Sequence, residues 1–296
     1  MPSAEISTDS CHRFLFDQGR IRGEVVHLSS SLKEALARKD YPPALASLLG
    51  QALTAVALLA DTIKMDGSLI LQVQGNGPVN TLVAQATDNG ELRGMVHCPE
   101  DIDQAGSYRD FVGDGRMVIT IDAAGNERYQ GVVSIEGDSL AETIDAYFIR
   151  SEQLATRIWL ASDGVQAGGI LLQQMPQADT EEFFQENQWQ HLVTMTETVT
   201  HRELAELAPQ QLLHRLYHQE EVTLYPAAPL YFHCGCSRDK IEAVLIQLGQ
   251  IEIEQIVIQE GLVRVECEFC NRAYQFDAVD ISTLFMATNQ PPSLRQ

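Results

Sequence analysis

The sequence predicts an α+β fold in three parts: an N-terminal α/β core domain with antiparallel sheets over residues 1–175, a helical linker over 176–232, and a small C-terminal domain over 233–296. Three observations predict this division. Strand and helix patterns alternate in the first part, the second is acidic and helical, and the third contains two close pairs of cysteines. With 296 residues, 45% apolar and 21% charged, the chain is long enough for more than one globular domain.

Alternating strand and helix patterns define the predicted core domain. Alternation of apolar and polar residues predicts strands at residues 12–17, 21–27, 68–74, 82–86, 117–122, 129–135, 157–161 and 169–172. Helical periodicity predicts helices at residues 30–39, 43–64 and 139–153. The turn sequences Gly75-Asn76-Gly77-Pro78 and Gly125-Asn126 stand between successive strands, so we expect β-hairpins at both places.

The predicted linker begins at Pro176 and ends at Phe232. It carries nine Asp or Glu residues against two Arg, a net charge of −7. Thr200 and Glu203 fit a capping box at the start of a helix, and Pro209 limits the length of any single helix. An apolar stripe is expected at Leu204, Leu207, Leu212, Leu213 and Leu216. The pattern fits either an ordinary two-helix connector or a marginally stable linker whose apolar face can be uncovered.

The C-terminal domain is predicted to be small and poor in apolar residues. Ser237 is a suitable N-cap for a helix that ends at Gly249. Further elements are expected as a hairpin of residues 253–258 and 262–266, a strand at 273–276 and a helical turn at 281–286. Because fewer than 65 residues with so little apolar mass form a poor core, we expect a metal to stabilise this domain.

Two cysteine pairs, Cys234 with Cys236 and Cys267 with Cys270, predict a four-cysteine site for one Zn²⁺ per chain. Their spacing matches neither common ferredoxin pattern, which disfavours an iron–sulfur cluster. His233 is a possible ligand, but four cysteines already complete a tetrahedron. The spacing fits a purely structural metal. It also fits a redox switch, because thiolates react with oxidants, and both local and crossed disulfides are then conceivable.

Charge and composition exclude several function classes. A net charge of −21 repels phosphate backbones and anionic membranes, so we expect no nucleic acid and no membrane as partner. The N-terminus lacks a secretory signal, which predicts a cytoplasmic protein. The longest uncharged run, residues 44–60, is shorter than a membrane span and is expected to be a buried helix.

The remaining cysteines and the glycine-rich segments predict no catalytic chemistry. Cys11 and Cys98 have no partners at a useful spacing and are expected to be buried as small apolar residues. The sequence has no phosphate-binding loop and no Gly-Lys dipeptide, which argues against an ATP-driven machine.

Motifs along nearly the whole chain resemble the redox-regulated 33-kDa heat-shock chaperonin family. In the C-terminal domain they are Phe232-His233-Cys234-Gly235-Cys236-Ser237, Leu248-Gly249, Val265-Glu266-Cys267-Glu268-Phe269-Cys270 and Tyr274-Gln275-Phe276. In the core domain they are Gly75-Asn76-Gly77-Pro78, Leu92-Arg93-Gly94, Tyr129-Gln130-Gly131, Ser151-Glu152-Gln153-Leu154 and Gly168-Gly169-Ile170-Leu171-Leu172-Gln173 with Met175-Pro176. The four cysteines show no departure from the family pattern.

The resemblance implies an ATP-independent holdase, not an enzyme, that binds unfolding client proteins and prevents their aggregation under oxidative and heat stress. It implies that the reduced, zinc-bound form is inactive and that peroxide or hypochlorous acid activates it. On this resemblance the redox-active disulfides are Cys234–Cys236 and Cys267–Cys270, and the linker of residues 176–232 loosens when they form. A monomer when reduced and a homodimer when oxidised are also implied.

Two other classes are weaker alternatives. An adaptor or nucleic-acid-binding protein with a structural zinc ribbon is disfavoured by the acidic composition and the lack of a basic stripe. A thiol oxidoreductase is disfavoured because Cys267 and Cys270 are expected to follow a hairpin. The strand-to-helix turn that lowers a thiol pKa is not predicted there.

Overall fold

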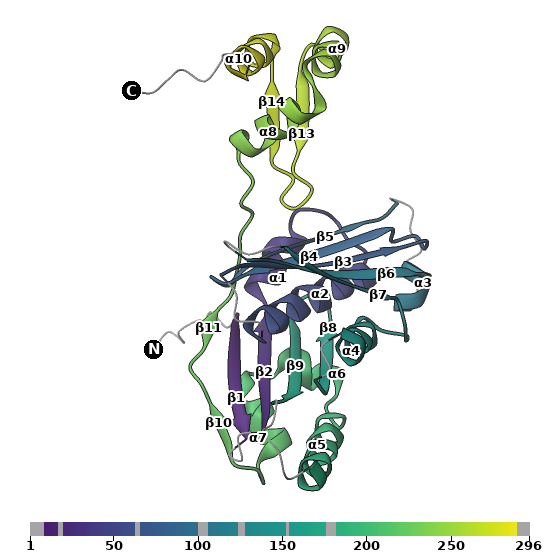
Figure 1. The fold of residues 1–296 in the computed structure, drawn as a ribbon, viewed down its shortest axis with the longest axis vertical. Coiled ribbons are helices and arrows are strands. Elements are labelled where there is room, and N and C mark those ends of the chain that lie inside the picture. The colour runs from purple at the N-terminus through teal and green to yellow at the C-terminus, as the bar shows by residue number, and fades with distance from the viewer. Residues whose placement is uncertain are drawn as a thin grey trace. The chain divides into compact units, whose positions relative to one another are not determined.

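The structure is a computed structural model that describes residues 9–16, 20–62, 66–99, 106–123, 128–151, 154–175 and 182–288. The chain forms two compact units, residues 1–233 and residues 234–296 (Figure 1). The first unit contains two sheets and the helices around them, and the second contains a two-stranded sheet with three helices. Helices and antiparallel sheets are therefore mixed in an α+β fold, as the sequence predicts.

One sheet of the first unit has the strand order β10-β1-β2-β9-β8, with β11 also paired to β1. All of these pairs are antiparallel. The strands of this sheet, which we call sheet A, are β1 (Ser10–Phe16), β2 (Ile21–Leu28), β8 (Thr156–Ser162), β9 (Ala167–Gln174), β10 (Val222–Leu224) and β11 (Ala228–Pro229). Sheet A thus combines strands from the predicted core domain with strands from the predicted linker.

The other sheet of the first unit, sheet B, has the order β12-β5-β4-β3-β6-β7. Only the β12–β5 pair is parallel. Its strands are β3 (Gly67–Gly75), β4 (Thr81–Thr87), β5 (Glu91–His97), β6 (Gly115–Ala123), β7 (Tyr129–Ser134) and β12 (Tyr231–Phe232). Both predicted hairpin pairs, β3–β4 and β6–β7, are confirmed, while the Gly125-Asn126 turn lies outside the described residues.

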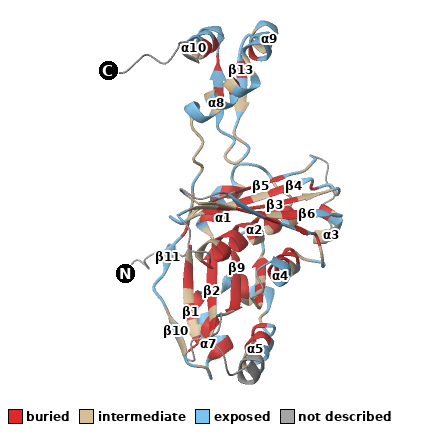
Figure 2. Cartoon of the chain, in the orientation of Figure 1, coloured by how far each residue is buried: buried red, intermediate tan, exposed pale blue. Residues whose placement is uncertain are grey.

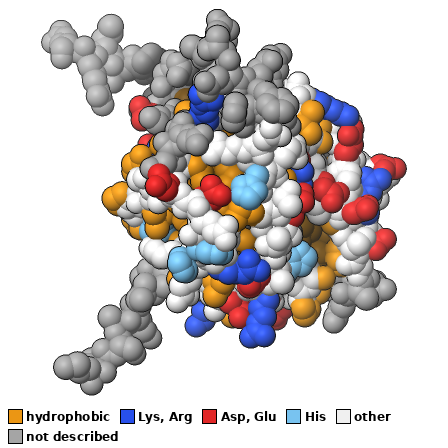
Figure 3. Space-filling view, turned by 90° about the horizontal axis from the view of Figure 1, so that it is seen from below, with side chains coloured by type: hydrophobic (Ala, Val, Ile, Leu, Met, Phe, Trp, Pro, Cys, Tyr) orange, Lys and Arg blue, Asp and Glu red, His pale blue; other side chains and the backbone are white. Residues whose placement is uncertain are grey.

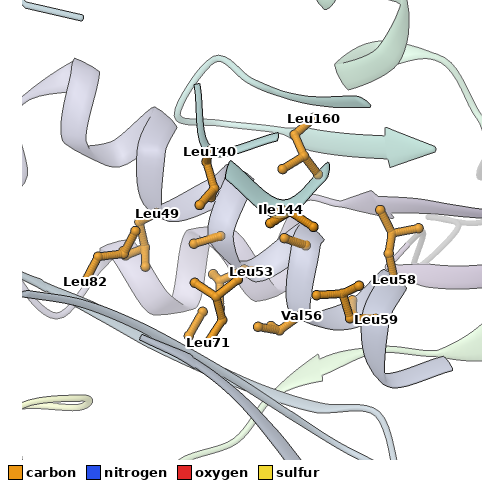
Figure 4. Packing of buried hydrophobic residues seen from close by; sticks show 14 of the residues in the cluster. Leu49, Leu53, Val56, Leu58, Leu59, Leu71, Leu82, Leu140, Ile144 and Leu160 are labelled. Carbon is orange, nitrogen blue, oxygen red and sulfur yellow. The ribbon is translucent and has the colours of Figure 1, made fainter. Parts of the chain in front are cut away.

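Four helices accompany these sheets: α1 (Ser30–Leu36), α2 (Pro43–Thr62), α3 (Tyr108–Val112) and α4 (Leu140–Ser151). Helix α2 lies at the centre of the unit. Its leucines, among them Leu49, Leu53 and Leu58, pack between sheet B on one side and α4 with β8 on the other (Figure 4). In the described part of the chain α2 alone has the length and apolarity of a membrane span, but 72% of its most apolar window is buried in protein. It is the predicted core helix.

The described part of the linker contains three helices, α5 (Glu182–Thr196), α6 (His201–Glu206) and α7 (Pro209–Tyr217). The Thr200 capping box is present, and Pro209 is the first residue of α7. The expectation of a helical linker up to Phe232 is wrong at its end, where β10, β11 and β12 form. Pro226 and Pro229 interrupt any helix there, and the edge of β1 offers backbone partners to Val222–Leu224.

The linker helices and sheet A share one hydrophobic cluster. Among the described residues, its sixteen buried members are Phe14, Phe16, Ile21, Val25, Ala161, Ile170, Leu172, Trp189, Leu192, Val193, Leu204, Ala205, Leu212, Leu213, Leu216 and Tyr217. Four of the five predicted stripe leucines are buried in it, and Leu207 packs against it at the margin. The predicted apolar stripe is confirmed, and in this structure it covers a face of sheet A.

The second unit contains α8 (Arg238–Leu248), α9 (Gln250–Glu260), β13 (Val263–Glu266), β14 (Ala273–Phe276) and α10 (Ala278–Thr288). The predicted strand at 253–258 is wrong, because that segment belongs to α9. Alternating Ile and Glu suggested a strand, but Ile253 is 1% exposed while Ile251 and Ile258 are 76% and 82% exposed. The residues that face inward are Ile253, Ile256 and Val257, which have helical spacing. The hairpin is formed instead by β13 and β14.

Candidate metal centre

The turn between β13 and β14 presents one cysteine pair. Backbone N–H groups of Cys270 and Asn271 donate to the carbonyl oxygen of Cys267, with N···O distances of 3.2 and 2.7 Å. The amide of Cys267 donates to the carbonyl of Arg272 at 3.0 Å. Asn271 has φ of 53°, in the left-handed region that asparagine tolerates better than most residues. This hydrogen-bonded turn holds two thiols, three positions apart, at the end of the β13–β14 hairpin.

The other pair lies directly before α8. The side chain of Ser237 caps α8 by accepting a hydrogen bond from the amide of Lys240 at 3.3 Å. The ammonium group of Lys240 donates in turn to the carbonyl of Gly235 at 2.5 Å. These two bonds fix the backbone on either side of Cys236, so that the start of α8 positions this pair.

All four sulfur atoms lie within 4.8 Å of one another. Two close sulfur–sulfur contacts join one pair to the other: 3.6 Å between Cys234 and Cys267, and 3.4 Å between Cys236 and Cys270. A tetrahedral zinc ion with Zn–S bonds of about 2.3 Å has sulfur–sulfur edges of about 3.8 Å. The number, type and separation of these donors fit a metal ion, and the four cysteines could hold one.

The thiols differ in how easily they ionise. Burial raises the pKa of Cys270 to about 12 and also raises the pKa of Cys267. Burial acts in the same direction on Cys236, but hydrogen bonds from the Tyr274 hydroxyl, at 3.1 Å, and from neighbouring thiols outweigh it and lower its pKa to about 7. Cys236 is therefore the first of these three to become a thiolate.

The other candidate residues lie apart from this group. His233 belongs to the first unit, where its amide donates to Leu92 and its Nε2 lies 3.8 Å from a carboxylate oxygen of Glu91. Cys11 is buried, at 3% exposure, as expected for a small apolar residue. Cys98 is half-buried and packs against the main core cluster.

Comparison with known proteins identifies the family. The family model described as Hsp33 protein matches residues 9–277. The chain belongs to the Hsp33 family. It is 46% identical over 284 residues to a 33 kDa chaperonin of Nitrosococcus oceani, covering 96% of each protein. It is 42% identical over 291 residues to that of Pseudomonas paraeruginosa, covering 97% of this chain and 98% of the relative.

A solved structure supports the same assignment at the level of the fold. The crystal structure of the 33 kDa chaperonin of Thermotoga maritima matches with a TM-score of 0.81 and 23% identity, covering 95% of this chain and 99% of that one. The resemblance predicted from sequence motifs is thus confirmed. Because Hsp33 relatives are named chaperonins, the chain is placed among chaperones, and these are not enzymes.

Sequence reasoning missed two side chains that support the centre. Tyr274 donates to Cys236, and Arg238 stacks over the Phe276 ring with its guanidinium carbon 4.2 Å from the ring centroid. Arg238 also forms an ion pair with Asp280 at 3.0 Å and so joins α8, β14 and α10. Spacing alone predicts candidate metal ligands but gives no signal for such neighbours. In the case of Tyr274, the only signal was its place in a family motif.

Proposed function

We propose that this chain is a redox-regulated, ATP-independent holdase of the cytoplasm that binds unfolding proteins and prevents their aggregation under oxidative and heat stress. The observation that carries this proposal is the four-sulfur group, which lies in a unit whose described residues form a cluster of only seven buried apolar side chains. A unit with so small a core depends on its ligands for stability. Chemistry at the sulfurs can therefore decide whether it stays folded.

In the reduced form, Cys234, Cys236, Cys267 and Cys270 would hold one Zn²⁺ per chain. An all-sulfur set favours zinc over the harder divalent ions. When bound, zinc would stabilise the folded unit by an amount that is on the order of 10–16 kcal/mol in small structural domains. In that form the linker helices α5–α7 stay packed on sheet A, and the chaperone is inactive.

Oxidation converts the metal ligands into disulfides. In each pair two zinc-bound thiolates lose two electrons and form one S–S bond, while one hydrogen peroxide takes up these electrons and two protons from solvent and becomes two waters; the Zn–S bonds break and the zinc ion is released. We propose the local bonds Cys234–Cys236 and Cys267–Cys270. Such short loops restrain the unfolded chain by only roughly 1.6–1.9 kcal/mol, which does not replace the stabilisation by the metal.

Crossed disulfides are the competing outcome. The sulfur contacts at 3.6 and 3.4 Å both join one pair to the other. A crossed bond closes a loop of about 34 residues and restrains the unfolded chain by roughly 3.8 kcal/mol, so it would preserve more structure. Peptide mapping after peroxide treatment distinguishes the two pairings, and dominant crossed bonds would contradict the proposed one.

Loss of structure in the second unit would reach the linker through the chain itself. The strand β12 ends at Phe232, and the amide of the next residue, His233, donates to the carbonyl oxygen of Leu92 at 2.9 Å, directly before Cys234. Once the following residues are unfolded, nothing after Cys234 restrains this short strand, and the end of the linker can fray. Release of α5–α7 from sheet A would then expose the buried apolar cluster to clients. The oxidised form is expected to dimerise.

Light scattering of a heat-unfolding test protein tests this function. Without ATP, peroxide-treated chain should suppress aggregation at near-stoichiometric amounts, while reduced, zinc-loaded chain should not. Treatment with reductant and zinc should reverse the effect. Equal suppression by both forms would contradict redox regulation, and no suppression by either would contradict the holdase function.

A further inference from the structure

Histidines are concentrated in the linker. Four of the eight in the chain, His191, His201, His214 and His218, lie between residues 176 and 232. In Figure 3, which views the molecule from below, histidine side chains gather near the middle of the visible face. This concentration lies outside the cysteine centre, and neither the fold nor the proposed chaperone cycle uses it.

Two of these histidines lie on one face of α7. His214 and His218 are four residues apart, so they occupy successive turns, and both are exposed, whereas Leu213 and Tyr217 are buried against sheet A. Their ring centroids are 6.2 Å apart. His218 ends α7 but keeps a right-handed helical backbone (φ −62°, ψ −14°), which preserves the helical spacing. Two histidines at this spacing on a helix are a known arrangement for binding a metal ion.

A carboxylate completes the group. His214, His218 and Glu220 all line one cavity of about 260 Å³ between α7 and β10. Glu220 follows α7 in a turn closed by its amide, which donates to the carbonyl of Tyr217 at 2.9 Å. Its carboxylate oxygen lies 3.1 Å from Nε2 of His191 on α5. Two imidazoles and one oxygen donor therefore border the same solvent-accessible space.

We propose that His214, His218 and Glu220 form a second metal site, which takes one divalent transition-metal ion that favours imidazole ligands, such as Zn²⁺, Ni²⁺ or Cu²⁺. Two histidines with one carboxylate are a common ligand set for such ions, and water completes the coordination. His191 is a positioning residue, because its hydrogen bond orients the carboxylate of Glu220. The net charge of −7 on the linker attracts a cation to this site.

The site must close on its ion. A tetrahedral ion bonded to two imidazoles at about 2.1 Å places their ring centres about 5 Å apart, so the rings need only approach by about 1 Å. Among the described residues, only the four cysteine sulfurs already lie together as a group within 4.8 Å. We therefore expect the histidine site to bind more weakly than the cysteine centre and to exchange its ion freely.

Binding here would act on the linker. The ligands come from α7 and from the turn that leads into β10, and His191 adds α5, so a bound ion connects segments that must separate when the linker is released. An ion that binds only the folded linker stabilises it by mass action. This consequence rests on the proposed function, whereas metal binding itself does not. The ion would oppose activation and raise the oxidant threshold.

Calorimetric titration of the reduced, zinc-loaded, untagged chain with Ni²⁺ at pH 7.5 tests the site. The wild-type chain should show one additional site. The variants His214→Ala and His218→Ala should each weaken that site at least 10-fold, and Glu220→Gln should weaken it several-fold. His201→Ala, an exposed histidine on α6, is the matched control and should bind as the wild type does. Absence of an additional site, or equal binding by the wild type and His214→Ala, would overturn the proposal.

Amide exchange under the same conditions separates this proposal from the chaperone function. Some amides of α7 and β10 can exchange only when the site opens. At a Ni²⁺ concentration about 100 times the dissociation constant, their exchange should slow by up to about 100-fold in the wild type. It should not slow in His218→Ala. Both measurements use reduced protein and no client, so they can succeed when holdase activity fails. Binding without slower exchange would refute the linker-locking role.

Discussion

The linker and the C-terminal unit are neighbours in sequence but are stabilised by different means. Sixteen buried apolar residues join the linker to sheet A, whereas the described residues of the C-terminal unit form a cluster of seven. Among the described residues, seven of the fourteen exposed large apolar side chains lie in the C-terminal unit, which is about a fifth of the chain. Figure 2 shows buried residues throughout the first unit and few in the second. Packing stabilises the linker, whereas the unit after it has a small core and, on our proposal, depends on its metal ligands.

The largest expected effect is on the C-terminal unit. Replacing Cys267 with serine removes one of four ligands, so bound zinc should fall from one per chain to near zero and α8–α10 should lose amide protection. The lost stabilisation is on the order of 10 kcal/mol. Metal analysis and amide exchange check this. Cys98→Ser is the control and should keep its zinc, and full zinc retention by Cys267→Ser would refute the ligand assignment.

A packing change should act on the linker instead. Tyr217 is 2% exposed, and its ring centroid lies 5.1 Å from that of Phe16, while its hydroxyl is 2.6 Å from that of Thr196. Tyr217→Ala should destabilise linker docking by about 3–5 kcal/mol. Exchange in α5–α7 should accelerate, and the reduced protein should begin to suppress aggregation, while zinc content stays at one per chain.

The matched control is Tyr225→Ala, since Tyr225 is 43% exposed and its loss should change neither exchange nor activity. If Tyr217→Ala kept a fully protected linker, the view that apolar packing holds the linker would be wrong.

A titration should affect the first unit alone. Glu24 is fully buried in β2, and burial raises its pKa to about 7. The folded state favours the protonated form of Glu24, so this group contributes its full share to the free energy of unfolding below pH about 4.5. That contribution, up to about 3 kcal/mol, is lost as pH rises through about 7. The variant Glu24→Gln should reduce this loss, leaving the part due to Asp145, whose pKa burial also raises to about 7. The variant Glu34→Gln, at an exposed position of α1, should leave the loss unchanged.

Tryptophan fluorescence during urea unfolding measures this effect, because both tryptophans, Trp159 and Trp189, belong to the first unit. Equal pH dependence in the wild type and in Glu24→Gln would contradict the assignment.

The smallest expected effect comes from a surface ion pair between the linker and β8. Arg157 lies 3.5 Å from Glu197, and both side chains are well exposed, so Glu197→Gln should destabilise linker docking by only about 0.2–1 kcal/mol. High salt should give a similar small change in the wild type. A loss as large as that of Tyr217→Ala would show that charge, rather than packing, holds the linker.

Sequence patterns predicted most of the first unit, because strands such as β3 and β4 alternate buried with partly exposed residues and because the long apolar run of α2 is typical of a buried helix. The strand β5 was missed, and Gly94 explains why. A Cβ at Gly94 would lie 2.9 Å from Leu49 and 3.1 Å from Leu53, because α2 packs closely against β5 there. The inward-facing position 94 therefore has no room for an apolar side chain, and the alternation of apolar and polar residues that predicts a strand is interrupted. Close approach of distant elements is a tertiary property and leaves no local pattern.

The four cysteines could be predicted from spacing, because metal ligation requires those residue types in close pairs. The support from Tyr274 and Arg238 could not, since it depends on how β14 and α10 pack against α8. For the same reason the end of the linker was wrongly expected to be helical, because β10 and β11 form only where β1 offers an unpaired edge.

The central claim is that oxidation releases a linker otherwise held by packing. Amide exchange over residues 182–224 tests it most directly, by comparing reduced, zinc-loaded protein with peroxide-treated protein. We expect α5–α7 and α8–α10 to lose amide protection on oxidation while β3, β4 and β6 keep theirs. Suppression of aggregation should rise in the same samples, and reductant with zinc should restore both the protection and the inactive state. If oxidised protein suppressed aggregation while its linker stayed protected, release of the linker could not be the mechanism of activation.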